Sequence, residues 1–458
     1  MLFHTWHFLL FFLVVYTIYL ILRRTSYWTH WLLFASCVFY GWWSPIYLLL
    51  ILYSTLLDYL IVYWMEKSSR KRTWLAVSIV SNLSVLAAFK YLAFFTDNLN
   101  GLLQWCGVVS RLEVPVGFLL PVGISFYTFQ SMSYTIDFYR GQIPRETSFI
   151  RFAAYVSLFP QLVAGPIERA RKLLPQLQHL PKLKLDMVTD GASLFVIGMF
   201  KKVAIADYLA MYADPVFANP AIQSASALWL GTIAFAWQIY FDFSGYTDMA
   251  RGIAKMMGFD LMRNFRHPYL ATSLGDFWSR WHISLSSWFK DYVYIPLGGN
   301  RHGRWRTNRN LMLTILLSGF WHGAAWTYVV WGCIHGVAMV ASRPLERSPK
   351  YEAVPRVFRQ ILVFLVVLLA WVFFRATSVE DALTILRGMF LAGWTDPVCP
   401  WILVAMVSGI WVYQWTTESK LSWIWKLAAI RIGMFCGMVL YLMFIPGTRQ
   451  APFIYFQF

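Results

Sequence analysis

The chain has 458 residues, of which 59% are hydrophobic, 19% aromatic and only 13% charged, and its formal net charge is +17. A soluble globular protein carries about 25% charged residues, so this composition excludes a soluble enzyme with a large core and predicts an all-α, polytopic membrane protein. The positive charge does not indicate nucleic-acid binding, because lysines and arginines gather in the cytoplasmic loops of membrane proteins.

The first four apolar segments each have about the length of a membrane-spanning helix. They cover residues 2–22, 28–43, 46–64 and 74–94. The first is not typical of a signal peptide, because its start carries no basic residue and Arg23 and Arg24 follow it instead of a small-residue cleavage site. Two spans separate this arginine pair from the basic run 66–72, so both lie on one side, and the positive-inside rule makes that side cytoplasmic. The N-terminus is then expected outside the cytoplasm.

The middle of the chain is less regular. Residues 116–139 and 152–167 are apolar but interrupted by proline and glycine, and 168–187 is basic and intermittently apolar, as an interfacial helix would be. Further spans are expected at 190–211, 226–241, 309–341, 356–374, 400–415 and 425–446. Residues 242–308 are too polar to cross lipid as one plain helix, so we expect them to line an intramembrane funnel. The funnel is expected to open to the cytoplasm, where four arginines gather: Arg301, Arg304, Arg306 and Arg309.

Two of the nine histidines are candidates for chemistry. His322 lies in LSGFWHGAAW, inside an apolar run, where an ionisable side chain is a functional hypothesis by default. Its neighbours Gly319 and Gly323 allow a backbone or a ligand to approach closely. His282 lies in FWSRWHISLSSWFKDY, whose apolar spacing predicts one amphipathic helix. The alternatives are a neutral imidazole that bonds a neighbouring helix, for His322, and an incidental residue of an interfacial helix, for His282.

Other motifs point to no second chemistry. Neither histidine has a ligand at zinc-site spacing, and the five cysteines are scattered, so no metal site is predicted. Phosphate-binding glycine loops and a GxSxG elbow are missing from the sequence. Asp242 and Asp248 could form a proton path, but the nearby Arg251 and Arg266 favour internal ion pairs.

The chain ends on APFIYFQF, in which only Tyr455 and Gln457 carry polar side-chain atoms. Disordered tails are usually polar, so an aromatic end around a single phenol is unusual. It is either a plug that packs against the bundle or a group that takes part in chemistry.

Five longer motifs stand out along the chain. They are LPVGISFYTFQSMSYTIDFYRG (120–141), FPQLVAGPIERA (159–170), YFDFSGYTDMARGIAKMMGF (240–259), FWSRWHISLSSWFKDYVYIPLGGNR (277–301) and the Trp-His-Gly at 321–323. With them the chain resembles the membrane-bound O-acyltransferases (MBOAT), and within these the bacterial alginate O-acetyltransferase branch, over roughly residues 1–450. The resemblance implies the MBOAT fold: about 11 to 13 membrane helices, with re-entrant and interfacial helices, around a central funnel or tunnel.

The resemblance also implies a site. The near-invariant histidine of the family corresponds to His322, and the second histidine of the branch to His282. The acyl group comes from a cytoplasmic thioester, which in this branch is acetyl-CoA, and no cofactor is permanently bound. The tail is similar to the C-terminal aromatic motif of the small partner protein in D-alanylation systems, whose tyrosine accepts the acyl group. This similarity implies that Tyr455 is the acceptor.

We therefore expect residues 1–458 to form a single integral membrane domain with an acceptor tail at 452–458, in the bacterial inner (cytoplasmic) membrane. His322 would act as general base on Tyr455, and His282 would position the donor or relay the proton. Donor phosphates would be bound by three basic residues: Lys290, Arg301 and Arg304. The expected partners are membrane lipid, a separate extracytoplasmic serine esterase-like (SGNH) acetyltransferase and, indirectly, a cell-envelope polysaccharide, but no nucleic acid.

Two alternatives remain open from the sequence. One is D-alanyl transfer from a carrier protein to teichoic acid, although a tail on the enzyme itself favours acetyl transfer. The other is a transporter or polymer-export channel, motivated by Asp242 and Asp248. Repeated halves would favour the transporter, and the sequence contains no repeat.

Overall fold

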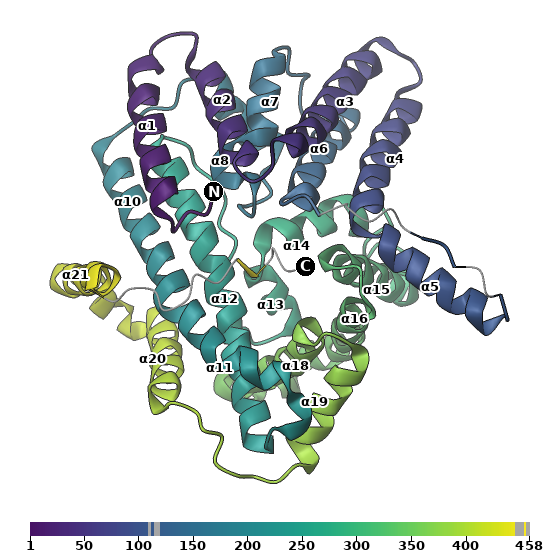
Figure 1. Ribbon diagram of the computed structural model, residues 1–458, viewed down its shortest axis with the longest axis vertical. Helices are drawn as coiled ribbons and strands as arrows, with labels where there is room; N and C mark the ends of the chain where they lie inside the picture. Colours follow the sequence, from purple (N-terminus) through teal and green to yellow (C-terminus); the bar gives the residue numbers. More distant parts are fainter. Residues whose placement is uncertain (109–110, 114–119, 445–452, 455–458) are drawn as a thin grey trace. The chain divides into compact units, whose positions relative to one another are not determined.

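The computed structural model describes residues 1–108, 111–113, 120–444 and 453–454, and every regular element within them is a helix (Figure 1). The chain divides into two compact units, Met1–Phe195 with Met249–Met262 and Val196–Asp248 with Arg263–Phe458. Both units are discontinuous in sequence. The single domain over 1–458 stays a prediction.

The helices of the first unit follow the apolar segments of the sequence. They are α1 (Trp6–Leu22), α2 (Trp28–Gly41), η1 (Pro45–Tyr47), α3 (Leu48–Lys67), α4 (Lys71–Lys90), α5 (Leu92–Trp105), α6 (Ile124–Tyr139), α7 (Phe149–Ser157), α8 (Phe159–Leu162), α9 (Ala170–Gln178) and most of α10 (Leu185–Phe200). The four predicted N-terminal segments are thus helical as α1 to α4. The segment 168–187 was predicted to be one interfacial helix. It is helical in α9 and again from the start of α10, and residues 179–184 between them have no regular structure.

Polar residues hold the centre of this unit together. Asp58 of α3 is wholly buried and accepts hydrogen bonds from Ser78 and Asn82 of α4. Ser54 of α3 hydrogen-bonds Ser131 of α6 at 3.0 Å. Buried polar groups are normally paired in this way, and between membrane helices such bonds stabilise association.

The second unit contains the chemistry-bearing motifs. Its helices are η2 (Lys201–Ala206), α11 (Asp207–Ala218), η3 (Pro220–Ile222), most of α12 (Ala225–Met256), η4 (Pro268–Leu270), α13 (Leu274–Arg280), α14 (Ile283–Phe289), η5 (Lys290–Tyr294), α15 (Gly303–His322), α16 (Trp326–Glu346), α17 (Pro349–Ala353), α18 (Arg356–Arg375), α19 (Val379–Leu391), α20 (Trp401–Thr417), η6 (Lys420–Lys426) and α21 (Ala428–Phe444). Two of these, η2 and η5, are π-helical turns, which occur often at functional sites.

Several of these helices differ from the predicted spans. The segment predicted as one span, 309–341, is two helices, because the backbone of Gly323 is extended (φ −165°, ψ 155°) and ends α15. Helix α12 runs for 32 residues, well beyond the predicted 226–241, so its second half occupies sequence that was expected to be broken. Its apolar and small residues continue the helical pattern past Asp242.

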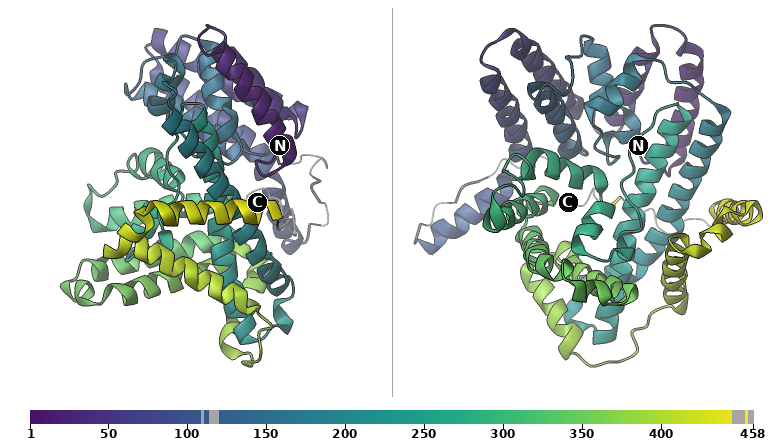
Figure 2. Two further views of the ribbon diagram at one scale, coloured as in Figure 1. Left: turned by 90° about the vertical axis from the view of Figure 1, so that its left-hand side faces the viewer. Right: turned by 180° about the vertical axis from the view of Figure 1, so that it is seen from behind.

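Three helices in the described residues are long and apolar enough to cross a membrane. They are Pro45–Lys67, Lys71–Lys90 and Arg356–Arg375. A fourth candidate is the pair Lys420–Lys426 and Ala428–Phe444, which is bent by 64°. The left view of Figure 2 shows α20 and α21, in yellow, running in different directions. The number of 11 to 13 membrane helices stays a prediction.

Glycines bring α15 and α16 into close contact, side by side in Figure 1. A Cβ added at Gly319 would lie 2.5 Å from the carbonyl oxygen of Tyr328 and 3.2 Å from the Cα of Gly332. The prediction that small residues beside His322 admit a neighbouring backbone is therefore confirmed.

We expect Gly319→Ala to lower the free energy of unfolding by about 1–3 kcal/mol, because the new methyl group overpacks a backbone contact. Gly409→Ala in α20 is the matched control, since a Cβ there meets nothing within 4 Å and alanine favours a helix. Melting temperatures of the two variants in detergent test this expectation. Equal values would contradict the close approach.

Candidate active site

His322 is the last residue of α15 and is only 4% exposed. Three rings pack edge-on around its imidazole, with centroid distances of 5.1 Å to Trp321, 5.3 Å to Trp331 and 5.2 Å to Phe374. These rings come from α15, α16 and α18. The predicted buried histidine therefore lies at a helix break and not in the middle of a continuous span.

His282 lies between α13 and α14, where the sequence pattern predicted one continuous helix. It is 1% exposed and adopts a left-handed backbone conformation (φ 41°, ψ 56°), which is uncommon for a residue other than glycine. Asn264 holds this break: its carbonyl oxygen accepts the N–H of Ile283 at 2.9 Å, and its side-chain oxygen accepts the N–H of Ser284 at 3.1 Å. Such strained conformations persist where the surroundings fix them, and they cluster at active sites.

One tryptophan connects the two histidines. The Trp321 ring lies 6.3 Å from the His282 ring and 5.1 Å from the His322 ring, centroid to centroid. The fold thus brings together two imidazoles that are 40 residues apart in the sequence. The residue patterns suggested each of them separately, and only the resemblance to the family implied that they act in one site.

A third buried histidine, His335 of α16, was not singled out from the sequence. It is fully buried, and its ring lies 4.8 Å from the Trp331 ring, which also contacts His322. Among the residues that the structure describes, neither of its ring nitrogens has a hydrogen-bond partner. Its position inside an apolar run was the signal that could have found it.

The beginning of the C-terminal tail lies beside His282. Phe453 and Ile454 are 1% and 3% exposed. The Phe453 ring stacks on Tyr246 at 4.6 Å and lies 5.7 Å from Phe243, whose ring is in turn 4.7 Å from His282. Tyr455, the predicted acceptor, lies outside the described residues. Phe453, two residues before it, is packed one aromatic ring away from the His282 imidazole.

The two acidic residues of α12 form ion pairs. Asp242 lies 2.8 Å from Lys202, and Asp248 lies 2.6 Å from Lys201. Internal ion pairs, favoured over a proton path in the sequence, are therefore confirmed, but these partners are lysines, whereas the sequence suggested Arg251 and Arg266. Both lysines belong to the π-helical turn η2, which the sequence reasoning did not consider.

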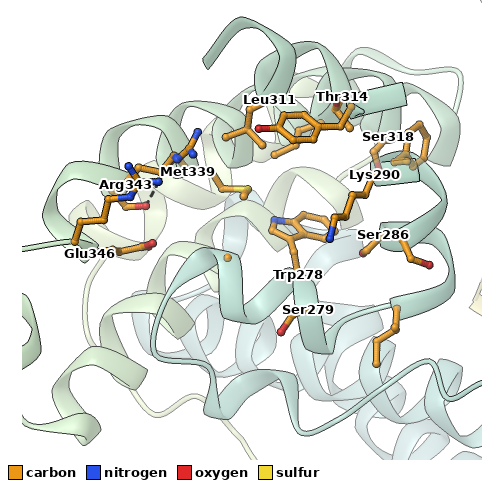
Figure 3. A pocket seen from close by; sticks show the side chains of 18 residues that line it. Trp278, Ser279, Ser286, Lys290, Leu311, Thr314, Ser318, Met339, Arg343 and Glu346 are labelled. Carbon is orange, nitrogen blue, oxygen red and sulfur yellow. Dashed lines mark hydrogen bonds between the residues drawn. The ribbon is translucent and has the colours of Figure 1, made fainter. Parts of the chain in front are cut away.

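A cavity of about 660 Å³ lies among the helices that carry the two histidines, although neither histidine is among its lining residues (Figure 3). Its walls come from α13, α14, η5, α15 and α16. The lining residues are Gly275, Trp278, Ser279, Ile283, Ser286, Ser287, Phe289, Lys290, Tyr294, Leu311, Thr314, Ile315, Ser318, Met339, Ser342, Arg343, Glu346 and Arg347. Ile283 directly follows His282, and Ser318 precedes His322 by one helical turn on the same face of α15. The volume of the cavity is within the range of small-molecule binding sites.

The basic residues of the cavity differ in part from the predicted set. Lys290 lines it, whereas Arg301 and Arg304 are exposed and are not among the lining residues. Arg343 and Arg347 line it instead, and Figure 3 shows Arg343 beside Glu346 at the end away from Lys290. Arg343 lies in the last turn of α16 and Arg347 directly follows its end, and this spacing of four residues was the signal that the sequence reasoning missed. Within the described residues, no three His, Cys, Asp or Glu side chains cluster as a metal site requires.

The sequence is similar to those of several known membrane acyltransferases. The family model of the membrane-bound O-acyltransferases matches residues 14–380, which include both His282 and His322. The chain is 44% identical over 371 residues to the probable alginate O-acetylase AlgI of Pseudomonas aeruginosa, which is 79% of this chain and 69% of that protein. It is 37% identical over 390 residues to the peptidoglycan O-acetyltransferase of Helicobacter pylori, covering 78% and 73% of the two chains.

A more distant relative is the teichoic acid D-alanyltransferase of Streptococcus thermophilus, which is 27% identical over 242 residues, or 50% of this chain and 58% of that protein. The match to the family model and the identity to the acetyl-transferring relatives extend over most of the chain. The chain belongs to the membrane-bound O-acyltransferase family.

Proposed function

We propose that this O-acyltransferase takes an acetyl group from cytoplasmic acetyl-CoA and places it on Tyr455 of its own C-terminal tail, for delivery to a cell-envelope polysaccharide. The observation that supports this most is the cavity, because it reaches the residue next to His282 and the turn before His322, and it carries basic side chains. A thioester bound there would have its acyl end near the imidazoles and its phosphates near cations. The named activities of the relatives, alginate and peptidoglycan O-acetylation, support acetyl as the group transferred.

The proposed reaction balances without a cofactor. The phenol oxygen of Tyr455 forms a bond to the thioester carbonyl carbon, and the carbon–sulfur bond breaks. His322 accepts the phenol proton and passes it to the departing thiolate, so that the products are an acetyl-tyrosine ester and free CoA. A phenol has a pKa near 10 and is a weak nucleophile at neutral pH, whereas an imidazole with an ordinary pKa near 6.5 suits the task of removing its proton.

His282 is proposed to assist His322 and Tyr455 by positioning the donor or relaying the proton. Asn264 accepts hydrogen bonds from the two backbone N–H groups that follow His282, and the His282 ring lies 4.7 Å from Phe243 and 6.3 Å from Trp321. A side chain held so firmly is preorganised, and preorganised positioning lowers a reaction barrier because little freedom remains to be lost.

The donor phosphates are proposed to lie toward the basic residues of the cavity, Lys290, Arg343 and Arg347. The roles of Arg301 and Arg304 stay predictions. Both side chains are exposed and lie outside the cavity lining.

Replacing Arg343 and Arg347 together by glutamine is expected to raise KM for acetyl-CoA about 10- to 100-fold and to change kcat much less. The reason is that hydrogen bonds to charged groups contribute about 1.5–3 kcal/mol and are made equally in the ground and transition states. Steady-state kinetics measure the two constants. The pair Arg301→Gln and Arg304→Gln is the matched comparison, and an unchanged KM in the Arg343/Arg347 variant would contradict placing the donor in this cavity.

The acetyl group is proposed to leave Tyr455 on the outer face of the bacterial cytoplasmic membrane. A separate extracytoplasmic acetyltransferase of the serine esterase type would then move it to the polysaccharide.

The alternative, D-alanyl transfer to teichoic acid, is named for relatives that share only 27–29% identity with about half of the chain. Competition between labelled acetyl-CoA and a D-alanyl carrier protein tests the choice: labelling from acetyl-CoA alone is expected, and labelling from the carrier alone would overturn it. The transporter alternative is disfavoured by the family to which the chain belongs.

A further inference from the structure

The tail is held by its backbone as well as by its rings. The N–H of Ile454 donates a hydrogen bond of 2.7 Å to Oδ2 of Asp242. Both residues are buried, with 3% and 2% of their surfaces exposed. A hydrogen bond to a carboxylate is stronger than one between neutral groups, and burial strengthens it further.

The carboxylate of Asp242 is itself fixed. Its other oxygen, Oδ1, lies 2.8 Å from Nζ of Lys202, and Lys202 also lies 2.8 Å from Oδ1 of Asp207. Lys202 is 3% exposed, so this ammonium is shared by two carboxylates away from water. Asp242 therefore presents one oxygen to the lysine and the other to the tail.

Residues of the same part of α12 pack against the side chain of Phe453. Tyr246 is four residues after Asp242, on the same helix face, and stacks on Phe453; Phe243 lies beside the same ring. Asp242 thus binds the backbone of the tail at Ile454, and the rings of Phe243 and Tyr246 contact the aromatic side chain just before it, Phe453.

We propose that Asp242, with Lys202 behind it, is the positioning residue that docks the C-terminal tail at Ile454, and that acyl transfer to the tail depends on this docking. This proposal rests on the proposed role of Tyr455 as acceptor. Asp242 does not touch the reacting atoms; it acts through the residue that precedes the phenol in the chain. Asparagine cannot replace it fully, because it offers one acceptor oxygen where two donors converge.

The test uses the full chain in lipid nanodiscs, with 4-fluorophenylalanine introduced at position 453. The fluorine resonance reports docking, because a docked ring is shielded from a soluble paramagnetic reagent and an undocked ring is not. Ile454→Pro removes the N–H donor without changing the helix bundle, and Ile454→Val is its matched control because it keeps that donor. We expect Ile454→Pro to raise the ratio of undocked to docked tail about 10- to 100-fold, and Ile454→Val to leave it unchanged.

A second pair of variants separates docking from the stability of the ion-pair cluster. Asp242→Asn is expected to undock the tail as Ile454→Pro does, whereas Asp207→Asn removes the other carboxylate of Lys202 and keeps the Asp242–Ile454 bond. The rate of acetyl labelling in a single turnover should fall in parallel with docking. Full shielding in Ile454→Pro, or labelling at the wild-type rate in an undocked variant, would overturn the proposal. If even the wild-type chain labels elsewhere than at Tyr455, the proposed function fails while the fluorine measurement still decides whether Asp242 docks the tail.

Discussion

Replacing Tyr455 by phenylalanine is expected to reduce acetyl labelling of the protein to background and to abolish acetylation of the polysaccharide. The substitution removes a single oxygen atom, which is the proposed nucleophile, and keeps the aromatic ring. The tail should therefore still dock through Phe453 and Ile454, which precede it in the chain. Radiolabelled acetyl-CoA, a single turnover and separation of the denatured protein measure the label that remains.

Tyr441→Phe in α21 is the control for this experiment, because it removes the same atom from another tyrosine near the C-terminus. We expect it to label as the wild-type chain does. Label that persists in Tyr455→Phe at the wild-type level would show that another group receives the acetyl, and the acceptor role would be wrong.

Replacing His322 by alanine is expected to slow acetyl transfer about 100- to 10,000-fold, the usual contribution of a positioned general base. Binding of acetyl-CoA should change little, since His322 is not among the residues that line the cavity. The rate of label formation in a single turnover, measured at saturating acetyl-CoA, is the readout. Added imidazole should restore part of the rate, because it fits the space that the side chain leaves and supplies the missing base.

His302→Ala is the matched control at the opposite end of the same helix. His302 occupies the N-cap position of α15, makes no side-chain capping hydrogen bond and is exposed, whereas His322 ends that helix and is buried. The control should label at the wild-type rate. An equal rate in His322→Ala would remove the general base from the mechanism, and an equal loss in both variants would indicate damage to α15 in place of lost chemistry.

The helices could be predicted where apolar residues run without interruption. Segments 2–22 and 356–374 fold as α1 and α18 with ends that agree within a few residues. The breaks could not be predicted, because they depend on contacts made by distant residues. Gly323 ends α15 where Tyr328 packs against it, and His282 leaves the helical conformation where Asn264 captures the next two N–H groups.

The candidate site, too, could be predicted only in part from the sequence. Motif resemblance identified His282 and His322, but only the fold shows that Trp321 contacts both. Arg343 and Arg347 were missed because a basic pair after an apolar helix is ordinary for a cytoplasmic loop. The role of Lys202 was equally hidden, since a lysine in an apolar stretch reveals neither of the two carboxylates that it joins.

Mapping the acetyl group on the wild-type chain is the most direct test of whether Tyr455 is the acceptor. The full-length enzyme would react once with isotope-labelled acetyl-CoA, be quenched in acid and be digested, and the C-terminal peptide would be sequenced by tandem mass spectrometry. We expect a single acetyl group on the oxygen of Tyr455, formed within one turnover and lost again when the extracytoplasmic acetyltransferase and polysaccharide are added. Acetyl-CoA consumed with an unmodified Tyr455 at every time point would contradict it.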